Sequence, residues 1–525
     1  MDLLLHNANI CSFHEGYSAG KTDALAVRGD RIFMLGRSSE LLPLAHPGTK
    51  IVDLGGKTVL PGFHDTHIHI WKVGNLKTYM LDVRATTSLD EMLSLIAAYH
   101  RAYPEAAWIT ARGFNEAAWK EGRMPTRHDL DKVVKDKPVY VIRTCAHIAV
   151  ANTAALEAAG ITARTSAPEG GIIYKDDNGR PNGLFSETAL GLITAHIPPY
   201  NKAELKTMVR AARAELYRYG ITAATDPAVD PVLLEAYREM EADGELGFRL
   251  QAIPILLPDG GSRPFPLPEQ FRSDLLTVDT VKFFSDGGLS GRTAALKGTY
   301  KNSTEKGVLR LQKDSWLTLC RAAHEKGWGI ATHAIGDAAI EFVIQVYRSL
   351  SASFPSMRRR IEHLGLPEEQ HLRDMAGLQI GTSMQTIFLH ELGRNFINYL
   401  GEDYLRRCYP VRSVLQQGIL TALSSDAPVV SDLNPLQGVQ TAITRHTREG
   451  LSIAPEEAIG VHQALKAYTI SAAGLSGLDR VGTLQPGHLA DVIVLDQDPC
   501  TTSTDKLTDI RVEQTYIGGR CVFHR

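Results

Sequence analysis

Two histidines separated by one residue, His67 and His69, follow the apolar stretch TVLPGF. Side chains two residues apart point to the same side of an extended strand, so two imidazoles in this arrangement can bind one metal ion. The pair is a weak signal by itself, because 19 histidines among 525 residues produce such pairs by chance. It indicates a metal site only if other ligand-type residues join it.

Three more ligand-type residues each follow the apolar part of a short predicted strand. His333 ends GWGIATH, His363 ends RRRIEH and Asp426 ends GILTALSSD. Taken singly, each is best explained as a surface residue that terminates a strand. Active sites of (β/α)₈ barrels, however, are built at the carboxyl ends of the strands. Together with the histidine pair, these positions predict a shared metal site.

Lys282 stands inside an otherwise apolar strand, TVKFF. A buried ammonium is costly unless it is paired or neutralised. One interpretation is a side chain that reaches solvent or a carboxylate. The other is a lysine whose pKa is lowered by burial beside metal cations. Its neutral amine can then add carbon dioxide and become a carbamate that bridges two metal ions, which together activate one hydroxide.

The elements that must position these residues alternate between short strands and helices, which predicts an α/β protein with a (β/α)₈ TIM-type barrel. We assign residues 59–75 plus 200–480 to this barrel. One of its helices is predicted to start at Asn201, with Glu204 completing a capping box, and to end at Gly220. The predicted strands are VLPGFHDTHIH, GITAATD, RLQAIPIL, DTVKFFSDG, GWGIATHAIGD, RRRIEHLG, LQIGTSMQTIF and GILTALSSDAP.

Both chain ends differ from this pattern. Residues 1–58 and 481–525 contain short β-type runs separated by turn signals, which predicts one composite β-sandwich domain built from both termini. The segment 76–199 is too long for a single crossover connection between two strands. It therefore predicts an inserted α+β domain that covers the barrel mouth.

Within the insert, Ser88 and Glu91 predict a capped helix, and Asn178-Gly179 predicts a hairpin turn. Its aromatic residues either form the core of the insert, which we favour, or line an apolar pocket. These residues are Trp108, Phe114 and Trp119.

The composition is that of an ordinary globular protein. The formal net charge is −3, with both signs interspersed, which argues against a nucleic-acid partner. The six cysteines form no Cys-x-x-Cys pair, and we find no signal peptide and no apolar run long enough to span a membrane. We therefore expect a cytoplasmic enzyme with a small-molecule substrate and no membrane partner.

Five segments in a fixed order resemble the amidohydrolase superfamily, above all its family-three branch, which includes N-substituted formamide deformylases. They are HDTHIH, VKFFSDGG-x-SGRTAAL, THAIGD, RIEH and SSDAPV, and PGHLADVIVLD near the end is also typical. The resemblance covers nearly the whole chain. It implies a barrel with a composite β-sandwich, a long insert after the first strand and, as is common in the family, a homodimer.

The resemblance also implies a role for each residue of the site. His67 and His69 would bind a first metal, a carboxylated Lys282 would bridge both metals, and Asp426 would be a ligand and the general base. His333 and His363 would bind the second metal. Zinc suits these ligands, with manganese, iron or cobalt as alternatives.

Four further residues each have two interpretations. The branch often reads GHS where this chain reads CAHIAVANTAAL, so His147 is either a hydrogen-bond donor to the substrate or a structural histidine. His64 either supports the first metal pair or is a plain turn residue. Asp286 and Arg292 either contact substrate or form a loop-stabilising ion pair.

These residues together predict hydrolysis of a non-peptide amide-type C–N bond in an N-formyl, N-acyl or cyclic amide, with Asp426 taking a proton from water and delivering it to the departing nitrogen. One alternative is a single-metal aminohydrolase, which usually lacks the lysine. Another is a non-catalytic small-molecule-binding homologue, which typically loses metal ligands. We find no Gly-x-Ser-x-Gly elbow, Gly-x-Gly-x-x-Gly fingerprint or P-loop. The substrate itself cannot be predicted from the sequence.

Overall fold

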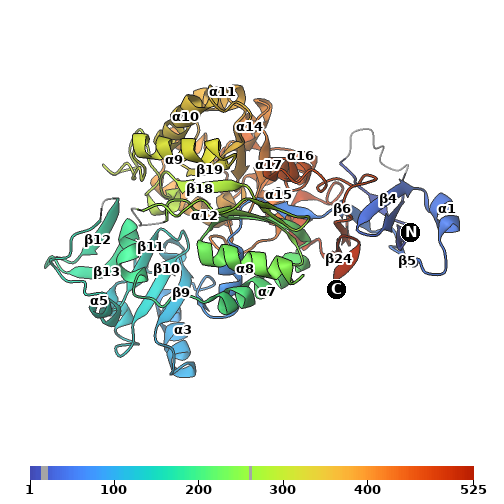
Figure 1. The fold of residues 1–525 in the computed structure, drawn as a ribbon. Coiled ribbons are helices and arrows are strands. Elements are labelled where there is room, and N and C mark those ends of the chain that lie inside the picture. Colours follow the sequence, from blue (N-terminus) through green and yellow to red (C-terminus); the bar gives the residue numbers. More distant parts are fainter. Residues whose placement is uncertain (14–21, 169, 259–262) are drawn as a thin grey trace.

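The computed structural model of the chain describes residues 1–13, 22–168, 170–258 and 263–525. Figure 1 shows three regions. Sheets that contain both termini lie at the right of the view, a central region combines parallel strands with helices, and the segment from β8 to β13 lies at the lower left.

The sheets at the termini share one hydrophobic core. One sheet has the order β4-β3-β1-β5 and the other the order β2-β6-β23-β24-β25, so the second sheet joins the two ends of the chain. Leu5, Val27, Val59 and Val492 come from both sheets and are buried together. The strands are β1 (Leu3–His6), β2 (Asn9–Ile10), β3 (Ala24–Arg28), β4 (Arg31–Gly36), β5 (Lys50–Asp53), β6 (Thr58–Pro61), β23 (Val492–Leu495), β24 (Val512–Ile517) and β25 (Arg520–His524).

The described central region contains a series of eight parallel strands, which form two hydrogen-bonded runs. β7, β14 and β15 form one run, β18 to β22 form the other, and a parallel bridge between Ile255 and Lys282 joins the two runs. These strands are β7 (Phe63–Asp65), β14 (Ile221–Val229), β15 (Arg249–Pro254), β18 (Thr280–Phe284), β19 (Gly329–Ala334), β20 (Arg359–His363), β21 (Gly381–Met384) and β22 (Thr421–Leu423). β16 (Phe271–Arg272) and β17 (Leu276–Val278) extend the edge of β15.

Backbone hydrogen bonds also connect the first and last strands of this series. The N–H of Asp426, after β22, donates to the carbonyl of His67, after β7, at 2.7 Å. The N–H of His69 donates to the carbonyl of Ala427 at 2.9 Å. The carboxyl ends of the first and last strands are therefore held side by side.

The first predicted strand, VLPGFHDTHIH, is two strands in two different sheets. β6 pairs with β23 in the terminal sheet, and β7 pairs with β14. The break falls at Gly62, where a Cβ atom would lie 2.1 Å from Oγ1 of Thr222. Only glycine permits this close approach of the two chains.

Helices cover the central strands, whose residues are buried on both faces as expected for parallel strands between helices. The longest begins at the predicted cap, where the N–H of Glu204 donates to Oδ1 of Asn201 at 3.0 Å. The helices are α2 (Ile70–Asn75), α7 (Lys202–Arg218), α8 (Pro231–Ala242), α9 (Lys313–Glu325), α10 (Asp337–Ser351), α11 (Glu369–Gly377), α12 (Ile387–Tyr399), α13 (Glu402–Leu405), α14 (Val411–Gln416), α15 (Pro435–Thr444), α16 (Val461–Ala467) and α17 (Ile470–Ser476).

The segment between β7 and β14 contains a six-stranded sheet with the order β12-β13-β11-β10-β9-β8 and hydrophobic clusters of its own. The predicted cap is present, since the N–H of Glu91 donates to Oγ of Ser88 at 3.2 Å. Phe114 and Trp119 are buried in the core of this region, as favoured above. Its elements are β8 (Leu81–Asp82), α3 (Leu89–Ala102), β9 (Ile109–Phe114), α4 (Arg127–Leu130), β10 (Val139–Arg143), β11 (Ile148–Ala151), α5 (Thr153–Ala158), β12 (Gly171–Lys175), β13 (Pro181–Glu187) and α6 (Gly191–Thr194).

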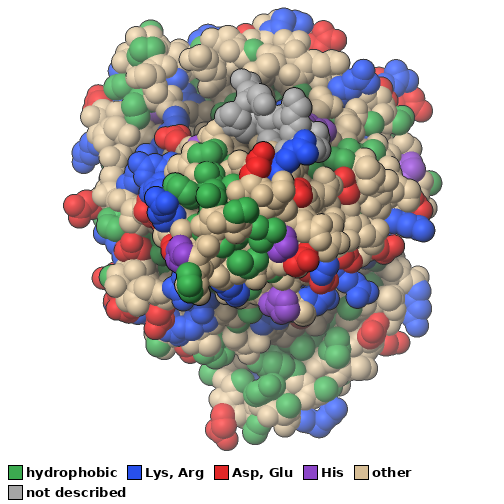
Figure 2. Space-filling view, turned by 90° about the vertical axis from the view of Figure 1, so that its right-hand side faces the viewer, with side chains coloured by type: hydrophobic (Ala, Val, Ile, Leu, Met, Phe, Trp, Pro, Cys, Tyr) green, Lys and Arg blue, Asp and Glu red, His purple; other side chains and the backbone are tan. Residues whose placement is uncertain are grey.

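The surface carries both signs of charge. On the face shown in Figure 2, basic and acidic side chains are interspersed. Among the described residues, no helix combines the length and the apolar character needed to cross a membrane.

Candidate metal centre

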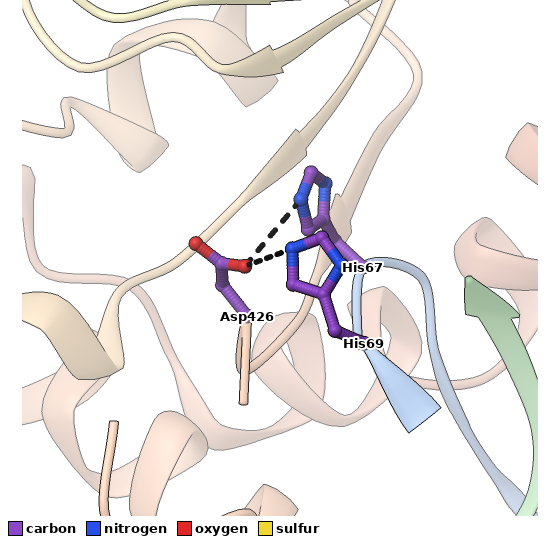
Figure 3. Close-up of side chains that lie close together, drawn as sticks. All are labelled: His67, His69 and Asp426. Carbon is purple, nitrogen blue, oxygen red and sulfur yellow. Dashed lines mark ion pairs between the residues drawn. The ribbon is translucent and has the colours of Figure 1, made fainter. Parts of the chain in front are cut away.

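Three predicted ligands converge at the carboxyl ends of the first and last parallel strands. Ligand-type atoms of His67, His69 and Asp426 all lie within 4.8 Å of one another, and all three residues are buried. Oδ1 of Asp426 lies 3.5 Å from Nε2 of His67 and 3.4 Å from Nε2 of His69 (Figure 3). One divalent ion fits among these three side chains.

The two histidines converge for a different reason from the one predicted. β7 already ends at Asp65, so His67 and His69 lie in the loop that leads into α2 rather than in a strand. Oδ1 of Asp65 accepts the N–H of His67 at 3.2 Å and also the N–H of Ser425 at 3.2 Å. A buried aspartate therefore organises the loops that carry the ligands.

The remaining predicted histidines extend the cluster. The ring centroid of His363 is 4.7 Å from that of His67 and 4.4 Å from that of His333. Burial lowers the pKa of His69 and that of His363 to about 3, so both imidazoles are neutral near pH 7. Neutral imidazole is the form that binds metal ions.

Lys282 in β18 is fully buried, and its Nζ has no hydrogen-bond partner among the described residues. Burial lowers the pKa of this amine to about 8, although the charges of Glu362 and Asp426 act to raise it. The lysine is close enough to contribute to the lowered pKa of His333 and of His363. An unpartnered buried amine next to the histidines fits the predicted carbamate ligand.

Asp426 supplies the negative charge of the site. Burial alone would raise the pKa of this carboxyl, but His67, His69 and His363 together hold it below its usual range. Its backbone φ of 57° places it in the left-handed region, where non-glycine residues are uncommon. Neutral imidazoles beside an ionised carboxylate form a donor set that suits zinc.

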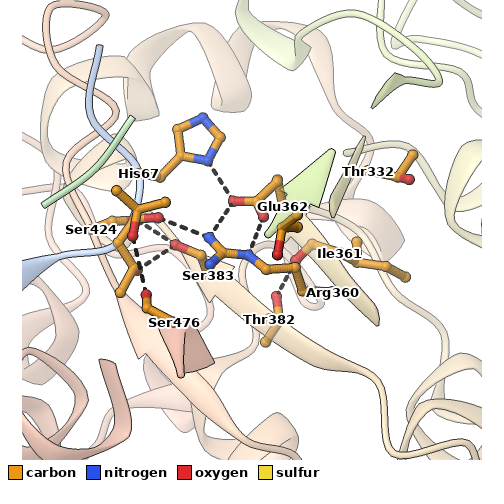
Figure 4. Close-up of polar contacts among 12 residues, drawn as sticks. His67, Thr332, Arg360, Ile361, Glu362, Thr382, Ser383, Ser424 and Ser476 are labelled. Carbon is orange, nitrogen blue, oxygen red and sulfur yellow. Dashed lines mark hydrogen bonds and ion pairs between the residues drawn. The ribbon is translucent and has the colours of Figure 1, made fainter. Parts of the chain in front are cut away.

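Hydrogen bonds from the next layer of side chains orient the ligands (Figure 4). Nδ1 of His67 lies 2.5 Å from Oε2 of Glu362, and Arg360 holds the same oxygen at 2.9 Å and the carbonyl of Thr66 at 2.8 Å. Nδ1 of His363 lies 2.7 Å from Oε1 of Gln385. Such partners set the ring orientation and leave Nε2 as the ring nitrogen that can bind a metal ion.

A cavity of about 110 Å³, here called the metal cavity, lies above this cluster. It is lined by residues of the central region and by residues of the segment from β8 to β13. The former are His67, His69, Lys72, Phe284, Gly288, Leu289, Ser290, His333, Ile335, His363, Phe388, Leu392, Phe396, Tyr409, Asp426 and Val429, and the latter are Arg112, Cys145, Ala146 and His147.

The sequence model of the amidohydrolase family matches residues 50–523. This chain belongs to the amidohydrolase family. It is 31% identical over 491 residues to the putative amidohydrolase YtcJ of Bacillus subtilis, with 91% of each chain covered. It is 30% identical over 545 residues to the N-substituted formamide deformylase of Arthrobacter pascens, which covers 100% of this chain and 98% of that relative.

Among solved structures, the amidohydrolase is similar to an uncharacterized metal-dependent hydrolase from Pyrococcus horikoshii. The TM-score is 0.76 at 25% identity, and 96% of this chain and 99% of the other are covered. The family and these relatives make this amidohydrolase a hydrolase that acts on carbon–nitrogen bonds.

The residues of the amidohydrolase that were predicted to lie near the metals or the substrate differ in whether they line the metal cavity. His147 lines the metal cavity, and its Nδ1 lies 3.1 Å from Oε2 of Glu187. Burial opposes protonation of His147, but the charge and the hydrogen bond of Glu187 and the charge of Cys145 together outweigh burial and raise the pKa. His147 stays a predicted substrate contact. His64 lies in β7, with Nε2 3.2 Å from Oγ1 of Thr225, away from the residues that line the metal cavity.

Asp286 and Arg292 are not among the residues that line the metal cavity. Oδ2 of Asp286 accepts the N–H groups of Ala295 and Gly336, both at 2.9 Å, so this buried carboxylate organises two loops. Arg292 is half-exposed and lies 3.2 Å from Glu305 in an ion pair. Both residues therefore have partners within the protein, and substrate contact by Asp286 or Arg292 stays a prediction.

Four residues near the site were missed in the sequence: Lys72, Arg112, Glu362 and Gln385. Arg112, a charged residue in the largely apolar run ITARGF, carries a signal similar to that of Lys282, whereas Glu362 lies in the polar run RRIEH and carries none. Lys72 and Gln385 stand at strand-to-helix junctions and carry no comparable signal.

Proposed function

We propose that this amidohydrolase hydrolyses a non-peptide amide-type C–N bond, in an N-formyl, N-acyl or cyclic amide, with a divalent metal centre. The observation that supports this most is the convergence of His67, His69 and Asp426 next to the unpartnered amine of Lys282. The similarity to an N-substituted formamide deformylase along the whole chain agrees with this substrate class.

We also propose that the eight parallel strands form a (β/α)₈ barrel with the site at its carboxyl-terminal end. The hydrogen bonds between the segments after β7 and β22, together with the bridge between Ile255 and Lys282, support a closed series of strands. In such barrels the catalytic residues come from the ends of several strands.

In this proposal His67, His69 and Asp426 would hold a first metal ion, and His333 and His363 would hold a second. Lys282 would supply a carbamate ligand, formed when its neutral amine adds carbon dioxide and releases a proton. When bound, divalent ions lower the pKa of water toward about 7 and polarise the substrate carbonyl. Zinc is the proposed metal because the ligands are imidazoles and carboxylates.

Asp426 is the proposed general base and acid. Because its pKa is held low, its carboxylate is ionised at neutral pH and can accept a proton from the attacking water. The water oxygen adds to the amide carbon, the C–N bond breaks, and the same carboxyl group returns the proton to the departing nitrogen. Glu362 keeps His67 in position throughout.

The test is turnover by the purified, metal-analysed protein on N-formyl amines, N-acyl amines and cyclic amides of similar size. We expect release of a carboxylic acid and an amine from at least one class, lost on chelation and restored by Zn²⁺. Metal-loaded protein that binds these amides without cleaving any of them would contradict the proposal.

A single-metal aminohydrolase is the second candidate, because His67, His69 and Asp426 alone come within 4.8 Å of one another among the described ligand-type groups. The number of metal ions bound per chain distinguishes the two candidate functions. We expect two ions per chain, and a single ion with ammonia release from a ring amine would favour the second candidate.

A further inference from the structure

A second cavity opens beside the metal centre and has a volume of about 190 Å³. This side cavity shares three lining residues with the metal cavity, namely Lys72, Arg112 and Ala146. Its volume is below the ~300 Å³ of a complete ligand pocket. It therefore suits one part of a ligand whose reacting bond lies in the metal cavity. The other lining residues are Trp71, Asn75, Met80, Tyr140, Ile142, Glu187, Leu190, Gly191 and Thr194.

Arg112, at the junction of the two cavities, is only 4% exposed. Within the described part of the chain its guanidinium makes no ion pair or hydrogen bond, and its Nε is buried without a partner. Burying a charged group without compensation costs several kcal/mol. Burial lowers the pKa of Arg112 only to about 10, so the side chain is a cation at neutral pH.

Arg143, in the neighbouring strand β10, shows that this sheet can neutralise a buried arginine. Its Nε and Nη2 donate to the two carboxylate oxygens of Glu116 at 2.8 and 2.9 Å. Among the described residues, no carboxylate pairs with Arg112 of β9 in this way. The difference indicates that the partner of Arg112 comes from outside the chain.

Lys72 places a second positive charge at the same junction. It follows His69 by one turn of α2, and no hydrogen bond or ion pair of its amine occurs among the described residues. Burial and the charge of Arg112 together lower its pKa to about 8, although nearby aspartates act to raise it. The two cations therefore interact, and an anion between them would relieve their repulsion.

Each acid nearby has one carboxylate oxygen engaged within the chain, while Oε1 of Glu187 and Oδ1 of Asp226 are buried without a hydrogen-bond partner among the described residues. Oε2 of Glu187 lies 3.1 Å from Nδ1 of His147 and 3.7 Å from Arg310. Oδ2 of Asp226, whose charge acts on Lys72, accepts the hydroxyl of Tyr237 at 2.5 Å. Asp426 also acts on both cations, but it belongs to the metal donor set described above.

We propose that Arg112 and Lys72 form a subsite for a carboxylate of the substrate. An arginine fork matches a carboxylate in two parallel hydrogen bonds, and Trp71, Met80 and Ile142 offer apolar surface to the carbon skeleton beside it. The preferred substrates are then amides that carry a carboxylate, such as N-formyl or N-acyl amino acids. This inference rests on the proposed function for the identity of the reacting bond.

The first test measures binding without hydrolysis. 3-Phenylpropanoate, which contains no amide, is titrated calorimetrically into the metal-loaded full chain, with 3-phenylpropan-1-ol as the neutral analogue. We expect the acid to bind and Arg112→Gln to weaken it about 10- to 100-fold, as for the loss of a charge-assisted hydrogen bond. Lys72→Met should weaken it less, and Arg101→Gln, at an exposed position on α3, should leave affinity unchanged.

Equal affinity of wild type and Arg112→Gln for the acid would overturn the subsite, because the anion would then be held by the metal ions alone. A melting temperature of Arg112→Gln close to wild type shows that lost affinity is not lost folding. Arg112→Met, which also removes the charge, must give the same result.

The second test compares N-acetylphenylalanine with N-acetylphenylalanine amide as substrates. We expect kcat/KM to favour the acid at least about tenfold, and Arg112→Gln to remove this preference while turnover of the neutral amide persists. Binding of the acid without cleavage of any amide would refute the proposed function but not the subsite. Equal cleavage of both substrates by wild type would refute the subsite but not the proposed function.

Discussion

Arg249 and Arg112 have the same exposure, 4%, but lie in two regions that treat a buried guanidinium differently. Arg249 stands at the start of β15, where its Nη2 donates to Oδ1 of Asp491 at 2.8 Å and ties the central strands to the C-terminal segment. Arg112 stands at the carboxyl ends of the strands and has no partner in the described chain.

The difference extends to other groups at the same end. Nζ of Lys282 and Oδ1 of Asp426 are also buried without a hydrogen-bond partner among the described residues. Buried polar groups in proteins are normally satisfied. Arg249 and Asp491 therefore stabilise the fold as an ion pair, and we expect the unpaired groups of Arg112, Lys282 and Asp426 to bind ligands.

Among the buried groups without a hydrogen-bond partner, substitution of Lys282 by alanine should have the largest effect on activity. Removal of the proposed bridge should release most of the metal and nearly all activity, with partial rescue by acetate or propionate, because a small carboxylate can replace the carbamate. Metal content by mass spectrometry and turnover of the best amide are the measurements. Full metal content together with full turnover would exclude the carbamate bridge.

Asp426→Asn should retain much of the metal, because His67 and His69 remain, but slow turnover by about 10²- to 10⁴-fold through the loss of proton transfer. Single-turnover rates and metal content measure the two effects separately. Unchanged turnover would remove Asp426 from the proposed proton-transfer role.

Arg249→Gln tests the ion pair between Arg249 and Asp491. It leaves Asp491 buried without its cation, so the free energy of unfolding should fall by about 3–5 kcal/mol. Chemical denaturation measures this loss, and turnover per folded molecule serves as the control. A stability equal to wild type would show that this pairing contributes nothing to the fold.

Glu362→Gln should weaken metal binding about 10- to 100-fold, because His67 loses the carboxylate that orients its ring. Competition with a chelator of known affinity gives the change in metal affinity. Gln385→Ala is the matched variant for His363. If neither variant changes metal affinity, the contacts of the two histidines with Glu362 and Gln385 serve folding only.

Arg112→Gln should have the smallest effect on stability, within about 1 kcal/mol of wild type or slightly stabilising, because it removes an uncompensated buried charge. The same denaturation assay that reports a large loss for Arg249→Gln makes the comparison direct. A loss as large as that of Arg249→Gln would mean that Arg112 has a stabilising role within the fold.

Much of this arrangement was predictable from the sequence. Strand and helix periodicity placed His333, His363 and Asp426 at strand ends, and the charge in TVKFF drew attention to Lys282. Capping patterns correctly placed the starts of two helices, at Asn201 and Ser88.

What could not be predicted depends on contacts between distant segments. The split of the first strand at Gly62 follows from its approach to Thr222, 160 residues further along the chain by the printed numbering. The junction of Lys72 and Arg112 exists only because the segment between β7 and β14 returns over the strand ends. Asp286 was a candidate for substrate contact because it follows a predicted strand, but its carboxylate accepts three backbone N–H groups.

The hydrogen bonds between the segments after β7 and β22 also have a consequence for how the protein matures. His67 and His69 leave the ribosome long before Asp426, and β6, directly before β7, pairs with β23 near the very end of the chain. A nascent polypeptide therefore lacks the complete donor set until Asp426, far along the chain from His67 and His69, has been synthesised. Ion capture at this position therefore follows the synthesis of the last of the eight parallel strands.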